Sequence, residues 1–180
     1  RELRDQLAAL SPDFEIVAVN DGSRDDTRAQ VLGVASECSV LYVELSRNFG
    51  KEAALSAGLD LARGSVVVML DADGQHPVGL LPAMLELWRQ GNDMVYGVRA
   101  HRRDESWVKR AGARAFYAAL DWMAHVEIPP DAGDFRLLDR RVVDALKRLP
   151  ERTRFMKGLY AWVGFRSTPI EFESCDRAGG

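Results

Sequence analysis

The sequence feature that most constrains the fold is a run of five apolar residues, 66–70, followed directly by Asp71 and Asp73. An apolar run without polar alternation is typical of a strand buried on both faces, as in parallel sheets. The two carboxylates then lie at the carboxyl end of that strand, where open α/β sheets bind ligands. They repel each other unless a cation or a proton neutralises one of them. Hard oxygen ligands suit Mg²⁺ or Mn²⁺, so the pattern indicates a metal-bridged diphosphate site. An acidic turn that only solvates a loop is the commoner meaning of Asp-x-Asp alone, so the other segments must decide.

The order of predicted elements indicates an α/β domain. The first half alternates helices and strands with short connections, which predicts a parallel, doubly wound sheet. The predicted helices there span 1–10, from Ser23 or Asp25 to about 36, 51–63 and 78–90, and the strands span 14–19, 40–45, 65–70 and 93–98. The second half predicts helices at 105–126, 141–149 and 155–163, and strands at 133–138 and 167–173. The aromatic residues of its last part are expected in the core: Phe155, Tyr160, Trp162 and Phe165.

Length and charge fit a single domain without a strongly basic surface overall. A chain of 180 residues fits one domain with a substantial core. Its net charge of −3 gives no general attraction for nucleic acid or an anionic membrane. The basic residues nevertheless concentrate in residues 99–114, which hold six Lys or Arg against two acids. The lone Cys38 and Cys175 lack metal-ligand spacing and fit reduced thiols in a cytoplasmic compartment. Because the chain begins without Met inside a predicted helix, we expect a fragment.

Familiar cofactor and catalytic motifs are absent from the sequence. There is no G-x-G-x-x-G turn, no P-loop and no G-x-S-x-G elbow. The three histidines have no zinc-ligand spacing among themselves or with the cysteines; they are His76, His101 and His125. A receiver-type phosphoacceptor domain would end after five β-α units, whereas this chain continues into a basic helix and a Gly-Asp-Phe-Arg segment. The remaining interpretation is a cation-dependent nucleotide-diphosphate site with a basic acceptor region nearby. Asp21 and Asp134 are further acids of this site, beside Asp71 and Asp73.

Six segments, in this order, resemble the glycosyltransferase family 2 enzymes of the dolichol-phosphate-mannose synthase and bactoprenol glucosyltransferase type. They are residues 19–25, 45–54, 71–77, 95–99, 133–140 and 154–158. The resemblance covers nearly the whole chain and is closest to the bactoprenol glucosyltransferase branch. It implies a GT-A type fold, in which a Rossmann-like, mostly parallel sheet is flanked by helices. Residues 1–180 would form one GT-A catalytic domain that lacks the family's first N-terminal strand and any C-terminal membrane helices.

The resemblance also implies substrates and a cofactor. The donor would be a nucleoside-diphosphate sugar, with UDP and glucose favoured, and the acceptor a polyprenyl phosphate such as undecaprenyl phosphate. Mg²⁺ or Mn²⁺ would hold the diphosphate, and transfer would invert the anomeric centre. The protein would work at the cytoplasmic face of the cell membrane without a nucleic-acid partner, and a homo-oligomer stays open.

Site roles carry over from the family by position. Asp21, Lys51 and Asp71 would contact the nucleotide, and Asp73, Gln75 and Asp71 would hold the metal ion. The residues expected at the acceptor phosphate are Arg99, Arg110, Arg114 and Arg136. Asp134 and Arg99 would be catalytic. A phosphate monoester has its second pKa near ~6 and barely needs a base, so Asp134 could equally orient the acceptor or Arg136.

Two other functions remain open at this point. A family 2 transferase acting on a saccharide or soluble acceptor would share the donor half but would not need the basic region. A non-catalytic module that binds nucleotide sugars for regulation would keep the fold without turnover.

Overall fold

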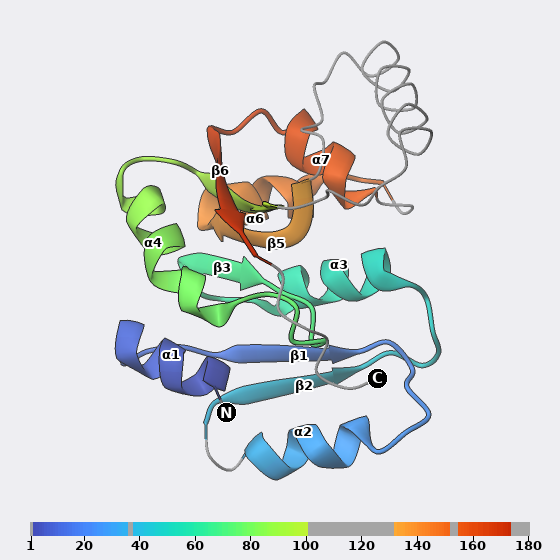
Figure 1. Cartoon of the computed structure of the whole chain (residues 1–180). Coiled ribbons are helices and arrows are strands. Elements are labelled where there is room, and N and C mark those ends of the chain that lie inside the picture. The colour runs from blue at the N-terminus through green and yellow to red at the C-terminus, as the bar shows by residue number, and fades with distance from the viewer. Residues whose placement is uncertain (1, 36–37, 101–131, 152–154, 174–180) are drawn as a thin grey trace.

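The computed structural model describes residues 2–35, 38–100, 132–151 and 155–173. Within these ranges the strands form two sheets (Figure 1). β1 (Ile16–Asn20) and β2 (Val40–Glu44) pair in parallel. The larger sheet has the order β3-β5-β4-β6, with β3 at Val66–Met69, β4 at Met94–Arg99, β5 at Ala132–Asp139 and β6 at Ser167–Phe172. The α/β class predicted from the sequence is confirmed. The one parallel sheet expected for the first half is not found among the described residues, because β1 and β2 form their own sheet and β5 lies between β3 and β4.

The direction of β5 decides what reaches the edge of the larger sheet. β4 and β6 are parallel, but β5 runs antiparallel to both of its neighbours, β3 and β4. Met69 therefore pairs with Arg136, and Val98 pairs with Ala132. The beginning of β5, which contains Asp134, consequently lies beside the carboxyl ends of β3 and β4.

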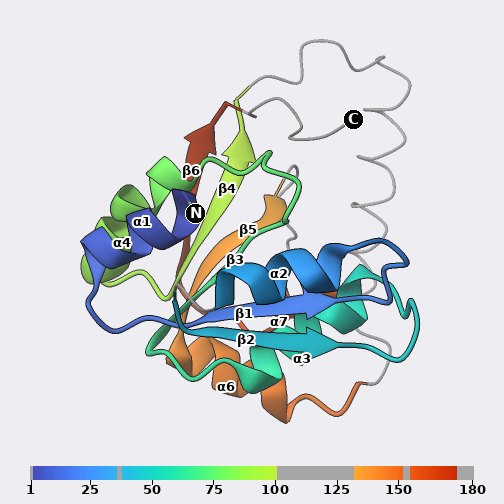
Figure 2. The same ribbon diagram turned by 90° about the horizontal axis from the view of Figure 1, so that it is seen from below.

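Helices cover both faces of this sheet. α1 (Glu2–Leu10), the 3₁₀ turn η1 (Val78–Leu80) and α4 (Leu81–Arg89) lie together on one face (Figure 2). α3 (Lys51–Leu61), α6 (Arg140–Arg148) and α7 (Met156–Trp162) pack on the other face. α2 (Thr27–Ala35) packs against β2 and β1.

Strand β3 is covered on both faces, as its continuous apolar run predicted. Val67 and Met69 of β3 join the core cluster of α3, α6 and α7. Val66 and Val68 face the opposite cluster, which includes α1 and α4. The fully buried side chains of the two clusters include Leu59, Leu81, Met84, Met94, Val95, Phe135, Leu137, Leu138, Val142, Leu146, Met156 and Tyr160. These two cores hold β3 in place, so the turn that follows it starts from a fixed point.

Most element boundaries agree with the sequence to within two or three residues, but the burial expected for two aromatic residues was wrong. The helix predicted for 51–63 ends at Leu61 with Ala62 as its cap, before Gly64 is reached. Tyr160 is buried, but Trp162 is 59% exposed and Phe155 43% exposed. Phe155 precedes α7 and lies over Gly158, where the absent side chain leaves room for its ring. The helix predicted for 105–126 lies outside the described residues. None of the described helices is long and apolar enough to cross a membrane.

Candidate functional site

The turn after β1 is built by two side chains that bond to backbone groups. Asn20, only 5% exposed, accepts the N–H of Ser23 and donates to the hydroxyl of Tyr42. Asp21 accepts the N–H groups of Phe49 and Gly50, at 2.7 and 2.9 Å. The turn after β1 thus fixes the loop after β2, and with it the first residue of α3.

That first residue, Lys51, joins two segments that are distant in sequence. Its Nζ lies 2.8 Å from Oδ2 of Asp71, just beyond β3, and 2.7 Å from Oδ2 of Asp134, in β5. Burial tends to lower the pKa of Lys51, but hydrogen bonds to Asp134 and Asp71 outweigh it and raise that pKa. The ammonium group is therefore charged at neutral pH and partly neutralises both carboxylates.

The Asp-Ala-Asp turn is held by His76, which is 8% exposed. Its Nδ1 accepts the backbone N–H of Asp71 at 3.0 Å. The imidazole ring stacks on Phe135 with 4.9 Å between ring centroids and meets Phe172 edge to face. Burial, the largest cause, lowers the pKa of His76, so the neutral ring that this hydrogen bond requires is favoured.

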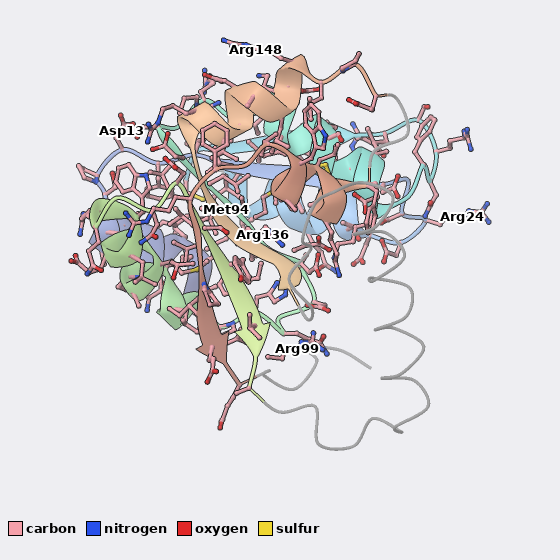
Figure 3. All side chains as sticks on the ribbon, turned by 90° about the horizontal axis from the view of Figure 1, so that it is seen from above. Asp13, Arg24, Met94, Arg99, Arg136 and Arg148 are labelled. Carbon is pink, nitrogen blue, oxygen red and sulfur yellow. The ribbon has the colours of Figure 1, made fainter. Side chains whose placement is uncertain are left out.

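Asp73 and Arg99 both form hydrogen bonds with Gln75. Oδ1 of Asp73 accepts the backbone N–H of Gln75, and the Gln75 side chain accepts a hydrogen bond from Arg99 Nη2 at 3.0 Å. Arg99 is exposed at the end of β4 (Figure 3). Gln75 thus links the turn that carries the acids to the guanidinium group of Arg99 at the end of β4.

Arg136 has a different environment. It is 3% exposed, and its guanidinium carbon lies 4.3 Å from the ring centre of Tyr160 and 5.1 Å from that of Tyr96. Nε donates to the carbonyl of Gly133, and Nη1 lies 3.2 Å from the sulfur of Met94. Burial lowers its pKa. Figure 3 shows Arg136 inside the fold beside Met94, and Arg99 at the outer end of β4.

The structure therefore brings together part of the predicted site. Lys51 contacts both Asp71 and Asp134, and Asp21 positions Lys51 through the loop. Asp73, Gln75 and Arg99 form a second, adjoining group. Arg136 borders a cavity of about 110 Å³ under α7 and does not join Arg99. Arg110 and Arg114 lie outside the described residues.

Sequence reasoning missed the roles of Asn20 and His76. Asn20 precedes Asp-Gly-Ser, and its ability to hold a turn through its own side chain was a usable signal. His76 was considered only as a zinc ligand, and its contact with Asp71 depends on the aromatic rings of β5 and β6. Because those two strands are far from His76 in the sequence, no local sequence pattern predicts the contact.

The donor set at the edge fits a hard divalent cation bound mainly by its ligand. Asp73 and Asp71 offer carboxylate oxygens, and Gln75 offers an amide oxygen, the ligand types that Mg²⁺ and Mn²⁺ prefer. Among the described residues, no group of three or more His, Cys, Asp or Glu side chains is arranged to hold a metal ion unaided. A cation would thus bind weakly to these side chains alone and more tightly when a diphosphate adds further oxygens.

Comparison with known families decides which class of protein carries this site. Residues 1–147 match the model of the family described as Glycosyl transferase family 2. The chain belongs to glycosyl transferase family 2. The match spans the turn after β1, the Asp-Ala-Asp turn and the Gly-Asp-Phe-Arg segment of β5.

Curated members of glycosyl transferase family 2 align with almost the whole chain. An uncharacterized glycosyltransferase of Synechocystis is 49% identical over 179 residues, covering 99% of this chain and 56% of its own. A bactoprenol glucosyl transferase of Shigella phage SfV is 41% identical over 177 residues, covering 97% of this chain and 58% of its own. The chain thus spans little more than half the length of these relatives.

Solved structures support the GT-A type fold of the family. TarS residues 1–349 from S. aureus align with a TM-score of 0.60 at 16% identity, over 96% of this chain and 54% of that one. Glucosyl-3-phosphoglycerate synthase from Mycobacterium tuberculosis, solved with Mn²⁺, UDP-glucose and phosphoglyceric acid, aligns with a TM-score of 0.59 at 20% identity, over 98% of this chain and 66% of that one. At these identities the likeness concerns the fold alone.

Proposed function

We propose that this chain is the catalytic domain of an inverting, cation-dependent hexosyltransferase. It moves a sugar, glucose in the favoured case, from a nucleoside-diphosphate sugar to a polyprenyl phosphate. The observation that carries this proposal is the meeting of Lys51, Asp71 and Asp134 beside Asp73, at the carboxyl edge of the strands. The name of the phage relative, a bactoprenol glucosyl transferase, supports the acceptor class and the sugar.

The donor half of the site consists of Asp21, Lys51 and Asp71. Lys51 offers an ammonium group to the diphosphate, and Asp71 offers a carboxylate to the ribose or to the cation's shell. Asp21 holds the loop before Lys51 and has both carboxylate oxygens engaged by backbone N–H groups. Its contact with the nucleoside therefore stays a prediction. UDP, the nucleotide favoured by the family resemblance of the sequence, stays a prediction that the comparison of UDP- and GDP-sugars tests.

Mg²⁺ or Mn²⁺ is the proposed cofactor, held by Asp73 with Asp71 and Gln75. When bound, such a cation neutralises charge that develops on the leaving diphosphate. Asp73 already has one oxygen fixed by the Gln75 N–H, which orients its carboxylate. Arg99 binds the Gln75 side chain and so holds that amide in place.

The acceptor half rests on Arg99 and on the predicted contribution of Arg110 or Arg114. A guanidinium fork matches phosphate oxygens through two parallel hydrogen bonds. Arg136 was predicted for the same phosphate, but it lies buried between two tyrosine rings, and its contact with the acceptor stays a prediction. Asp134 orients the acceptor or removes a proton from it. Orientation of the acceptor is the simpler role, because a phosphate monoester is largely ionised at neutral pH and barely needs a base.

A lipid acceptor implies a membrane surface as the place of work. We propose the cytoplasmic face of the cell membrane, where nucleotide sugars and the phosphate end of the lipid meet. Assembly into a homo-oligomer is compatible with this placement.

The test is transfer of labelled sugar by the purified protein to three kinds of acceptor. These are undecaprenyl phosphate, a soluble sugar phosphate and a free saccharide, each offered with a panel of UDP- and GDP-sugars. We expect cation-dependent product only with the lipid phosphate, and with UDP-glucose as the preferred donor. Product on a soluble acceptor alone would favour the other kind of family 2 transferase. Donor binding without any transfer would favour a regulatory module.

A further inference from the structure

We propose that Lys51 acts as an internal counter-cation, which holds Asp71 and Asp134 together until the donor and its divalent cation displace it. The inference deepens the proposed function, since it concerns the same site and rests on a cation binding there. It gives Lys51 a role in the ligand-free protein that differs from contact with the nucleotide.

The geometry is that of one ammonium group shared by two carboxylates. The Nζ atom lies 2.8 Å from Asp71 and 2.7 Å from Asp134, and both contacts use the Oδ2 atom of the acid. The three residues come from three segments, namely the start of α3, the turn after β3 and the first part of β5. Lys51 thus connects strands β3 and β5 at the edge of the sheet where the ligand is expected.

Asp134 depends on this contact more than Asp71 does. Its side chain is 15% exposed, against 33% for Asp71, and its Oδ1 atom is buried with no hydrogen-bond partner among the described residues. A carboxylate removed from water is costly unless it is paired and hydrogen-bonded. In the part of the chain that the structure describes, Lys51 supplies the ion pair of Asp134.

Lys51 is also free to leave. Its side chain is 48% exposed, and lysine is a flexible point charge that needs no fixed fork of donors. A diphosphate offers the ammonium group several charged oxygens in place of one carboxylate. When Lys51 turns toward the diphosphate, the Asp71 oxygen that it held becomes available. The exchange lets the ligand-free protein avoid unpaired acids at its edge without closing the site.

The experiment measures Mn²⁺ binding to the purified protein without nucleotide or lipid, from the paramagnetic resonance signal of free Mn²⁺. Lys51→Met removes the competing charge, and we expect Mn²⁺ affinity to rise roughly tenfold. Lys51→Arg keeps the charge and is expected to leave the affinity within about twofold of the wild type. Arg47→Met is the matched control, because it removes one positive charge from the loop just before Lys51, where Arg47 lies over the Phe49 ring.

Two results would overturn the inference. One is an equal change in Mn²⁺ affinity in Lys51→Met and Arg47→Met, which would mean that only overall charge matters. The other is unchanged Mn²⁺ affinity in Lys51→Met; weaker binding of metal-free UDP by that variant would then make Lys51 a nucleotide ligand alone. If Lys51→Met does not fold by circular dichroism, Lys51→Gln is judged by the same criteria. Since no sugar or acceptor is present, failure here is separate from failure of the transfer assay.

Discussion

Gly22 lies where the loops after β1 and β2 approach most closely. A Cβ atom at this position would lie 2.6 Å from the backbone of both Arg47 and Asn48. Its φ of +73° is also a conformation that side chains rarely adopt. Any side chain at this position would therefore strain the turn that carries Asp21.

Gly22→Ala is expected to lower the free energy of unfolding by about 1–3 kcal/mol, because both the contact and the backbone are strained. Gly33→Ala is the matched control. It lies in helix α2 with nothing within 4 Å of the added atom, so stability should rise slightly. Urea denaturation measures both. Equal stability of the two variants would contradict the close approach of the loops.

His76 makes the stability of the fold depend on pH. Burial lowers its pKa in the folded protein below the ordinary value of 6.5, so the unfolded chain binds a proton first as the pH falls. Stability is therefore complete above pH 6.5 and declines as the pH drops below it, until the folded pKa is reached. Protonation at Nδ1 would also remove the acceptor that holds the Asp71 N–H.

Denaturant unfolding at several pH values between about 5 and 8 measures this contribution. His76→Asn keeps an acceptor near the Asp71 N–H but has no titrating ring, so its stability should vary less with pH than that of the wild type. The variant will be less stable at every pH, since it loses the contacts with Phe135 and Phe172. An unchanged pH dependence in the variant would assign the effect to other groups.

Among elements, the start of helix α3 is set by strand β1. Asp21 follows β1 and accepts the N–H groups of Phe49 and Gly50, immediately before Lys51. Gly50, the residue before the helix, has a φ of 96° and no side-chain cap. The contact of Asp21 therefore decides where the helix begins and where Lys51 points.

Asp21→Ala removes both acceptors and is expected to destabilise the protein by about 1–3 kcal/mol. Asp21→Asn keeps one acceptor oxygen and should lose about half as much. Both variants should bind UDP more weakly, in the order of their loss of stability, if Asp21 acts by positioning Lys51. Weak UDP binding in a fully stable Asp21→Asn variant would instead favour direct contact with the nucleoside.

Strand β5 was predicted from the sequence, but its neighbours in the sheet were not. The segment 133–138 was expected to be a strand, and β5 indeed spans Ala132–Asp139. Its antiparallel course between β3 and β4 could not be read from the segment, because local residue patterns do not state which strands become neighbours. That course brings Asp134 to Asp71, so the contact of the two acids through Lys51 was beyond the sequence even though each residue had been named.

Burial of single side chains was also only partly predictable. The apolar run in β3 is covered on both faces, as continuous apolar strands are. The burial of Arg136 and Trp162 differs from what their residue types suggest. The charged Arg136 is 3% exposed, and the aromatic Trp162 is 59% exposed. The Tyr96 and Tyr160 rings that surround Arg136 come from other elements, and α7 has only seven residues with which to bury its aromatic side chains.

For the molecule as a whole, the two cores hold the strands of the site from opposite faces of the sheet. The cluster under α3, α6 and α7 holds β3 and β5 together from one side, and the cluster under α1 and α4 holds them from the other. The acids lie at the strand ends between these cores, on the edge where Lys51, Asp73 and Arg99 are exposed or partly exposed. Changes at this edge should therefore affect function more than stability.

The measurement that tests the central claim most directly is formation of lipid-linked glucose from UDP-glucose and undecaprenyl phosphate, with and without EDTA. Wild type and Asp73→Asn would be compared with Asp13→Asn, a matched change at an exposed acid before β1. The account predicts product from wild type and Asp13→Asn, loss of product with EDTA, and at least a roughly hundredfold decrease in Asp73→Asn, as expected when charge stabilisation at the leaving group is removed. Undiminished product in Asp73→Asn, or in the presence of EDTA, would contradict it.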